Sequence, residues 1–193
     1  MNLPRRIFNL PNGITIGRFF LSAVLMALLM LEQTPSVAFA AWLAFVLAAV
    51  SDWLDGWLAR RWQSVTVLGK LMDPLADKVL VTTALVMLIP LGRIPAWLVL
   101  MILVRELVVT GLRGVASSRG IVVAASWLGK WKSTVQYVGL GFLIFPAGLL
   151  PFIPEWLILK TGLLIMYAAL VLTIWSGFDY FYKLRRIFLE EDA

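Results

Sequence analysis

Residues 52–77 read DWLDGWLARRWQSVTVLGKLMDPLAD, and this charged stretch decides how the rest of the chain is interpreted. Asp52 and Asp55 are three residues apart, and Asp73 and Asp77 are four apart. Side chains at these spacings share one face of a helix. The stretch therefore predicts two neighbouring helix ends that can turn four carboxylates toward each other.

The sequence on both sides of this stretch is too apolar for a soluble protein. Hydrophobic residues make up 61% and charged residues 15% of the 193 residues, against about 45–50% and about 25% in soluble domains. Mean hydropathy is +0.90. A membrane helix needs about 20 residues, and six runs fit, at residues 13–31, 36–60, 69–90, 95–116, 131–149 and 156–182.

We therefore expect one all-α integral membrane domain over residues 1–193, with six transmembrane helices. Residues 1–12 would form a short interfacial segment, and residues 183–193 a charged tail. Basic residues gather on alternate links, at Arg5, Arg6, Arg60, Arg61, Lys70, Arg119, Lys130, Lys183, Arg185 and Arg186. The positive-inside rule then puts both termini in the cytoplasm of a multi-pass protein of the cell (inner) membrane. The net charge of +6 is explained by these loops and anionic lipid, without nucleic acid.

The absence of histidine and cysteine excludes several kinds of chemistry. Zinc hydrolases, thiolate nucleophiles and Ser-His-Asp triads all need one of these residues. Carboxylates remain, and they are the natural ligands of Mg²⁺, Mn²⁺ and Ca²⁺. Any catalytic site must therefore use Asp, Glu, Lys, Arg, Tyr, Ser, Thr or a bound metal ion.

The third and fourth apolar runs are too short to cross a membrane without charged residues. The third helix must extend back through Lys78, Asp77 and Asp73, and the fourth must include Arg105 and Glu106. Charges at membrane depth usually face a polar cavity. We expect one such cavity, open to the cytoplasm, in which a pair of divalent metal ions relieves the repulsion between the aspartates.

Simpler interpretations exist for single residues. Asp73 before Pro74 would suit a helix N-cap, and Asp55 could pair with a nearby arginine. Gly56 and Ala59 could serve helix packing alone. A cation transporter is a further alternative, although its acidic site should lie near the bilayer centre. A catalytically inactive membrane scaffold would be expected to lack one of the aspartates.

The spacing in full is D-x2-D-G-x2-A-R-x8-G-x3-D-x3-D, and it runs from Asp52 to Asp77. It resembles the signature of the CDP-alcohol phosphatidyltransferase family, and all eight defined positions match. The resemblance implies a six-helix membrane fold, a homodimer, and transfer of a phosphatidyl group from CDP-diacylglycerol to an alcohol with Mg²⁺ or Mn²⁺ as cofactor.

The resemblance also implies roles for individual residues. Asp52, Asp55 and Asp73 would bind one metal ion, and Asp52, Asp73 and Asp77 the second. Asp77 would also be the general base for the acceptor hydroxyl. The CDP-diacylglycerol site would comprise Asn12, Thr15, Arg18, Gly56, Ala59, Arg60, Thr66 and Gly69. For Arg18, snorkelling to lipid phosphate is the alternative.

The acceptor is indicated by two runs outside the signature. These are R-E-x6-R from Arg105 to Arg113, and SWLGKWKSTVQ from Ser126 to Gln136. Both resemble phosphatidylglycerophosphate synthases of this family, whose acceptor is glycerol 3-phosphate. The basic side chains that would hold its phosphate are Arg105, Arg113, Lys130 and Lys132. Inositol phosphate or serine are the alternative acceptors, and Lys130 and Lys132 could also be ordinary cytoplasmic-side charges.

Overall fold

The computed structural model describes residues 10–62, 67–118 and 127–189, and they contain helices but no β-strand. The helices are α1 (Leu10–Met30), α2 (Pro35–Trp62), α3 (Val67–Leu88), α4 (Ala96–Ser118), α5 (Trp127–Ile144), the short 3₁₀ helix η2 (Ala147–Leu149) and α6 (Glu155–Leu189). The prediction of an all-α chain with six long helices is confirmed. The fifth helix ends earlier than expected because Pro146 disfavours helical geometry in the residue before it.

Helix α3 is continuous through Asp73 and Pro74. It begins at Val67, two turns before the proline, so the interpretation of Asp73 as an N-cap is wrong. Asp73 and Asp77 are both interior residues of one helix, four positions apart. Their spacing therefore places them on the same face of α3, as the sequence predicted.

Local sequence signals explain where helices start and stop. Thr34 caps α2, since its hydroxyl accepts a hydrogen bond from the Val37 amide at 3.4 Å, and Pro35 occupies the first helical position. Between α3 and α4, Gly92 has a φ of 67°, a conformation that glycine adopts without strain. Arg93 follows, and its guanidinium donates to the carbonyl of Leu143 at 2.8 Å. This contact ties the α3–α4 link to the end of α5.

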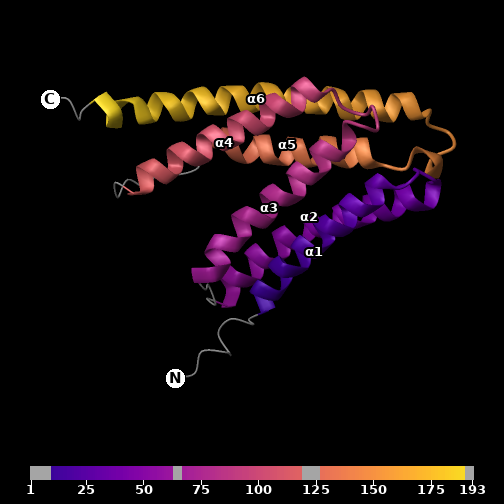
Figure 1. Cartoon of the computed structure of the whole chain (residues 1–193), viewed down its shortest axis with the longest axis horizontal. Coiled ribbons are helices and arrows are strands. Elements are labelled where there is room, and N and C mark those ends of the chain that lie inside the picture. The colour runs from indigo at the N-terminus through magenta and orange to yellow at the C-terminus, as the bar shows by residue number, and fades with distance from the viewer. Residues whose placement is uncertain (1–9, 63–66, 119–126, 190–193) are drawn as a thin grey trace.

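The six helices form two groups that converge at one end. Figure 1 shows α1, α2 and α3 together, and α4, α5 and α6 together, meeting near the α1–α2 and α5–α6 links and spreading apart toward the other end. Helices α5 and α6 pack closely through two glycines. A Cβ on Gly162 would lie 2.9 Å from Cβ of Phe142, and one on Gly139 would lie 2.8 Å from Sδ of Met166.

Large apolar side chains lie on the surface of the described residues as well as in their interior. A core of buried leucines, isoleucines and alanines joins the helices, yet large apolar side chains such as Leu107, Phe152 and Phe178 are 73%, 95% and 72% exposed. Residues 13–30 and 155–182 are long and apolar enough to cross a membrane. The helices between them in the chain carry the charged residues that are expected at membrane depth. That these helices also cross the membrane, giving six crossings in all, stays a prediction.

Candidate active site

A cavity of about 400 Å³ lies between α3, α4 and α5; its exposed lining is mostly apolar, and it is called the polar cavity below for the charged side chains that it contains. Its walls contain apolar side chains together with nine polar or charged ones, namely Asp77, Lys78, Thr82, Glu106, Thr110, Lys132, Ser133, Gln136 and Tyr137. Two residues that the sequence singled out, Asp77 and Lys132, therefore line one space although they come from different helices. The proposed base and one proposed phosphate-binding cation are neighbours in this fold.

Asp77 has a partner that the sequence did not reveal. The hydroxyl of Tyr137, on α5, donates a short hydrogen bond to Oδ1 of Asp77. The Tyr137 ring packs on Phe45 of α2, with 5.9 Å between the ring centroids. Residues from α2, α3 and α5 thus fix one edge of the cavity around the Asp77 carboxylate.

Lys132 is buried and forms an ion pair with Glu106. Its side chain is 7% exposed and that of Glu106 is 25% exposed. The same Glu106 oxygen accepts a hydrogen bond from Nη1 of Arg105 at 3.2 Å. One carboxylate on α4 therefore balances two cations, as burial of charge requires.

Arg105 is engaged chiefly with α6. Its Nε donates to the carbonyl of Thr173 at 3.1 Å, and its Nη2 donates to the Ser176 hydroxyl at 2.7 Å. These two bonds and the one to Glu106 bind the guanidinium to protein groups. Arg105 is not among the residues that line the cavity. In this structure Arg105 is a link between α4 and α6.

Arg113 lies outside the residues that line the cavity. Its Nε donates to the Tyr180 hydroxyl at 3.1 Å, and its guanidinium stacks 5.0 Å from the centroid of that ring. Lys78, which the sequence analysis treated only as a charge inside α3, does line the cavity and donates to Thr110 at 2.6 Å. The position of Lys130 on α5 is described, but its side chain lies outside the described part of the structure.

The predicted donor-binding residues on α1 are partly described. Thr15 and Arg18 are buried, with 1% and 0% exposure. A fully buried guanidinium does not reach lipid phosphate, so the snorkelling interpretation of Arg18 is wrong. Helix α1 packs against both α2 and α3, which carry the signature aspartates. The side chain of Asn12 lies outside the described part of the structure.

The remaining signature residues are placed by backbone alone. Asp52, Asp55, Gly56, Ala59 and Arg60 lie in the last turns of α2, and Gly69 and Asp73 in the first turns of α3. Their side chains, and Thr66 altogether, lie outside the described part of the structure. Their helical positions are confirmed, and their convergence on a metal ion stays a prediction.

The donor set suits a hard divalent cation in chemistry, although the described side chains alone do not assemble it. Among those side chains, no three His, Cys, Asp or Glu residues lie together. Asp77 is described, and its carboxylate faces a polar cavity. Packing of α2 against α3 brings together the two helices that carry the other three aspartates. Oxygen donors of this kind fit Mg²⁺ or Mn²⁺.

Sequence reasoning missed the part that two residues play in the cavity, Gln136 and Tyr137. Glu106 was expected inside the fourth helix and facing a polar cavity, whereas Gln136 was recognised only as part of a run that ends one residue before Tyr137. Gln136 is 3% exposed and lines the cavity, and its amide nitrogen has no hydrogen-bond partner within the described part of the chain. The spacing of Lys132, Gln136 and Ser133 along α5 was the available signal, because these residues share a helix face.

Fold and site together show an apolar, all-helical protein, within its described residues, with a cavity that contains two carboxylates and two lysines. Comparison with known proteins identifies the class. A model of the family described as CDP-alcohol phosphatidyltransferase matches residues 8–175, and the chain belongs to this family.

Two relatives match over nearly their whole length. The chain is 38% identical over 188 residues to a Bacillus subtilis (strain 168) protein, covering 92% of this chain and 95% of the relative. It is 36% identical over 190 residues to an Escherichia coli (strain K12) protein, covering 95% and 99%. Both relatives are named CDP-diacylglycerol–glycerol-3-phosphate 3-phosphatidyltransferase.

Proposed function

We propose that this protein transfers the phosphatidyl group of CDP-diacylglycerol to glycerol 3-phosphate, giving phosphatidylglycerophosphate and CMP. The observation that carries the proposal is the shared cavity of Asp77 and Lys132. It brings a candidate base within one small space of a buried cation that suits a phosphorylated acceptor. The names of the relatives support the same donor and acceptor.

The acceptor phosphate is assigned to the basic side of the cavity. Lys132 and Lys78 both line it, and each ammonium group can donate to phosphate oxygens. Gln136 adds an amide donor whose burial without a partner is costly and which a bound acceptor would satisfy. Arg105 and Lys130 remain proposed contributors to phosphate binding. Arg105 would act indirectly, through its hydrogen bond to Glu106. Arg113 would contribute only after leaving Tyr180.

The reaction is a substitution at the phosphorus of the phosphatidyl group. The acceptor hydroxyl oxygen forms a new bond to that phosphorus, the bond to the CMP oxygen breaks, and CMP leaves with the bonding electrons. Asp77 accepts the proton of the attacking hydroxyl. Positioned general bases of this kind contribute about 10²–10⁴-fold to rate.

Asp52, Asp55, Asp73 and Asp77 are the residues that would hold Mg²⁺ or Mn²⁺. When bound, such ions neutralise charge on the diphosphate and on the departing CMP. Gly56, Ala59 and Gly69 are small residues, which would let the CDP moiety approach the helix backbones. Asn12, Thr15, Arg18, Arg60 and Thr66 complete the proposed donor site.

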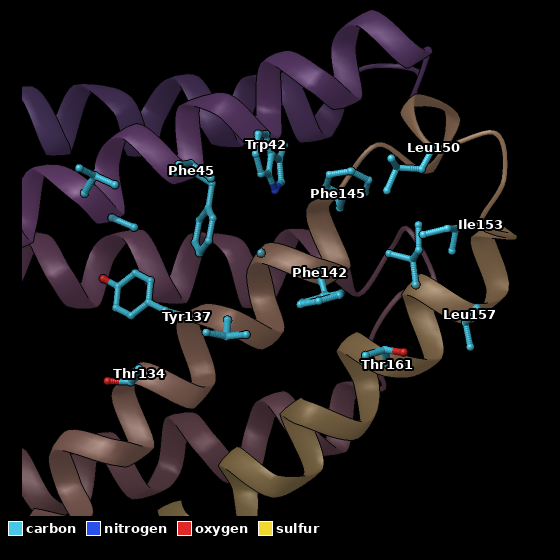
Figure 2. Close-up of a pocket in the computed structure, with 16 residues that line it drawn as sticks. Trp42, Phe45, Thr134, Tyr137, Phe142, Phe145, Leu150, Ile153, Leu157 and Thr161 are labelled. Carbon is cyan, nitrogen blue, oxygen red and sulfur yellow. The ribbon is translucent and has the colours of Figure 1, made fainter.

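The acyl chains of the donor need an apolar surface beside this site. A groove of about 920 Å³ lies between α2, α5 and α6, and Figure 2 shows the side chains of Trp42, Phe45, Phe142 and Phe145 that line it. Tyr137 lines both this groove and the polar cavity. At about 1.5 Å per residue, the eight steps from Tyr137 to Phe145 span about 12 Å, close to the roughly 15 Å of half a hydrocarbon core. We assign one acyl chain to this groove.

The proposal places the protein in the cell membrane with the cavity and both termini on the cytoplasmic side. The support is the distribution of basic residues over alternate links. A homodimer is proposed on the family resemblance alone.

The test is CMP release from CDP-diacylglycerol by purified protein in detergent. Glycerol 3-phosphate is compared with serine and with inositol phosphate, each with and without EDTA. We expect release with glycerol 3-phosphate only, abolished by EDTA and reduced at least about 100-fold in Asp77→Asn. Asp179→Asn, on α6 and outside the cavity, is the matched control and should retain activity. Release that prefers another alcohol would overturn the acceptor.

A further inference from the structure

Tyr137 stands between the polar cavity and the apolar groove. It is one of the residues that line both. Its hydroxyl donates to Oδ1 of Asp77, while its ring packs against Phe45 and lies at the end of the groove in Figure 2. An apolar ring with one polar tip suits such a boundary.

We propose that Tyr137 is a positioning residue for Asp77, holding its carboxylate in the orientation that accepts the proton of the acceptor hydroxyl. The inference rests on the proposed function, in which Asp77 is the base. A carboxylate has two oxygens that accept hydrogen bonds. When Tyr137 holds Oδ1, rotation of the carboxylate is restricted and Oδ2 takes a defined direction.

Both partners are held by their own surroundings. On α3, Ala76 and Leu80 beside Asp77 are 0% exposed, and on α5 Leu140 beside Tyr137 is also 0% exposed. The two helices therefore cannot shift freely to restore a lost contact. A hydrogen bond to a charged group is stronger than a neutral one, so its loss should be measurable in the rate.

The decisive variant is Tyr137→Phe, which removes the hydroxyl and keeps the ring against Phe45. We expect kcat for CMP release to fall about tenfold, while KM for glycerol 3-phosphate and for CDP-diacylglycerol stays within about twofold, because a misaligned base affects the transition state rather than substrate binding. Tyr167→Phe is the matched control. Tyr167 lies on α6 against Trp97, outside both pockets. The kcat of the Tyr167→Phe variant should equal that of the unmodified protein.

A second readout does not depend on turnover. Mn²⁺ binding to the purified protein is titrated by electron paramagnetic resonance of the free ion. Loss of a partner that orients a metal ligand weakens binding by about 10–100-fold, so Tyr137→Phe should bind Mn²⁺ about tenfold more weakly. In an Asp77→Asn background the same change should have no further effect, because the carboxylate that Tyr137 orients is gone.

The outcomes separate this proposal from the proposed function. Normal kcat and normal Mn²⁺ affinity in Tyr137→Phe would overturn the positioning role. So would an equal loss of Mn²⁺ affinity with and without Asp77, which would indicate a general structural effect. If the unmodified protein releases no CMP with glycerol 3-phosphate, the proposed function fails, and the Mn²⁺ titration in both backgrounds decides the role of Tyr137.

Discussion

Replacing Glu106 by Gln should destabilise the protein through the cation that it leaves behind. Lys132 is 7% exposed and is paired with Glu106. Removing one partner of a fully buried pair costs about 3–5 kcal/mol. Since Glu106 is 25% exposed, solvent screening reduces the value, and we expect a loss of about 2–3 kcal/mol.

The assay is thermal unfolding in detergent, followed by the fluorescence of the nine tryptophans. For a chain of this size, about 1 kcal/mol corresponds to a shift in Tm of about 2–4 °C. Glu106→Gln should therefore lower Tm by about 4–12 °C. Lys132→Met should lower it less, because the carboxylate left unpaired is more exposed and still receives a hydrogen bond from Arg105.

The double variant tests whether the loss of stability comes from the unpaired Lys132. With both charges removed, no buried ammonium group lacks a partner, so Glu106→Gln with Lys132→Met should be more stable than Glu106→Gln alone. A double-mutant cycle gives the coupling directly. If the loss of stability in the double variant equals the sum of the losses in the two single variants, the claim that the buried ion pair links α4 to α5 is refuted.

Three further predictions follow from packing and topology. Gly162→Ala should lower Tm more than Gly139→Ala, because the new Cβ meets a helix-proximal carbon of α5 in the first case and a flexible methionine in the second. Gly141→Leu, which adds bulk inside the apolar groove, should raise KM for CDP-diacylglycerol but leave KM for glycerol 3-phosphate unchanged. The chain has no cysteine, so a membrane-impermeant maleimide should label Phe152→Cys in intact cells and Ser118→Cys only after permeabilisation; the reverse pattern would contradict the proposed orientation.

The helices and the charged positions within them were predictable because they depend on local sequence. Apolar run lengths predicted the number of helices, and the short runs after Lys78 and after Arg93 indicated that charges must lie inside α3 and α4. Helix bounds were less exact: α5 begins at Trp127 and stops before Pro146, and α6 continues to Leu189, beyond the apolar run that predicted it. Local spacing also placed Asp73 and Asp77 on one face of α3.

The contacts between helices were not predictable from spacing. Tyr137 and Asp77 are separated by 60 residues and Lys132 and Glu106 by 26, and no pattern within one helix reports how two helices pack. For the same reason the sequence counted Arg105 as an acceptor ligand, whereas its guanidinium is held by α6. Burial of Arg18 likewise depends on α1 packing against both α2 and α3.

The central claim is that the phosphatidyl group is transferred to glycerol 3-phosphate. The most direct test uses the purified protein in liposomes containing CDP-diacylglycerol, isotopically labelled glycerol 3-phosphate and Mn²⁺, with the lipid product identified by mass spectrometry. We predict labelled phosphatidylglycerophosphate in equal amount to the CMP released, and neither product from Asp77→Asn. Release of CMP without labelled lipid would mean that water is the acceptor, and it would contradict the account.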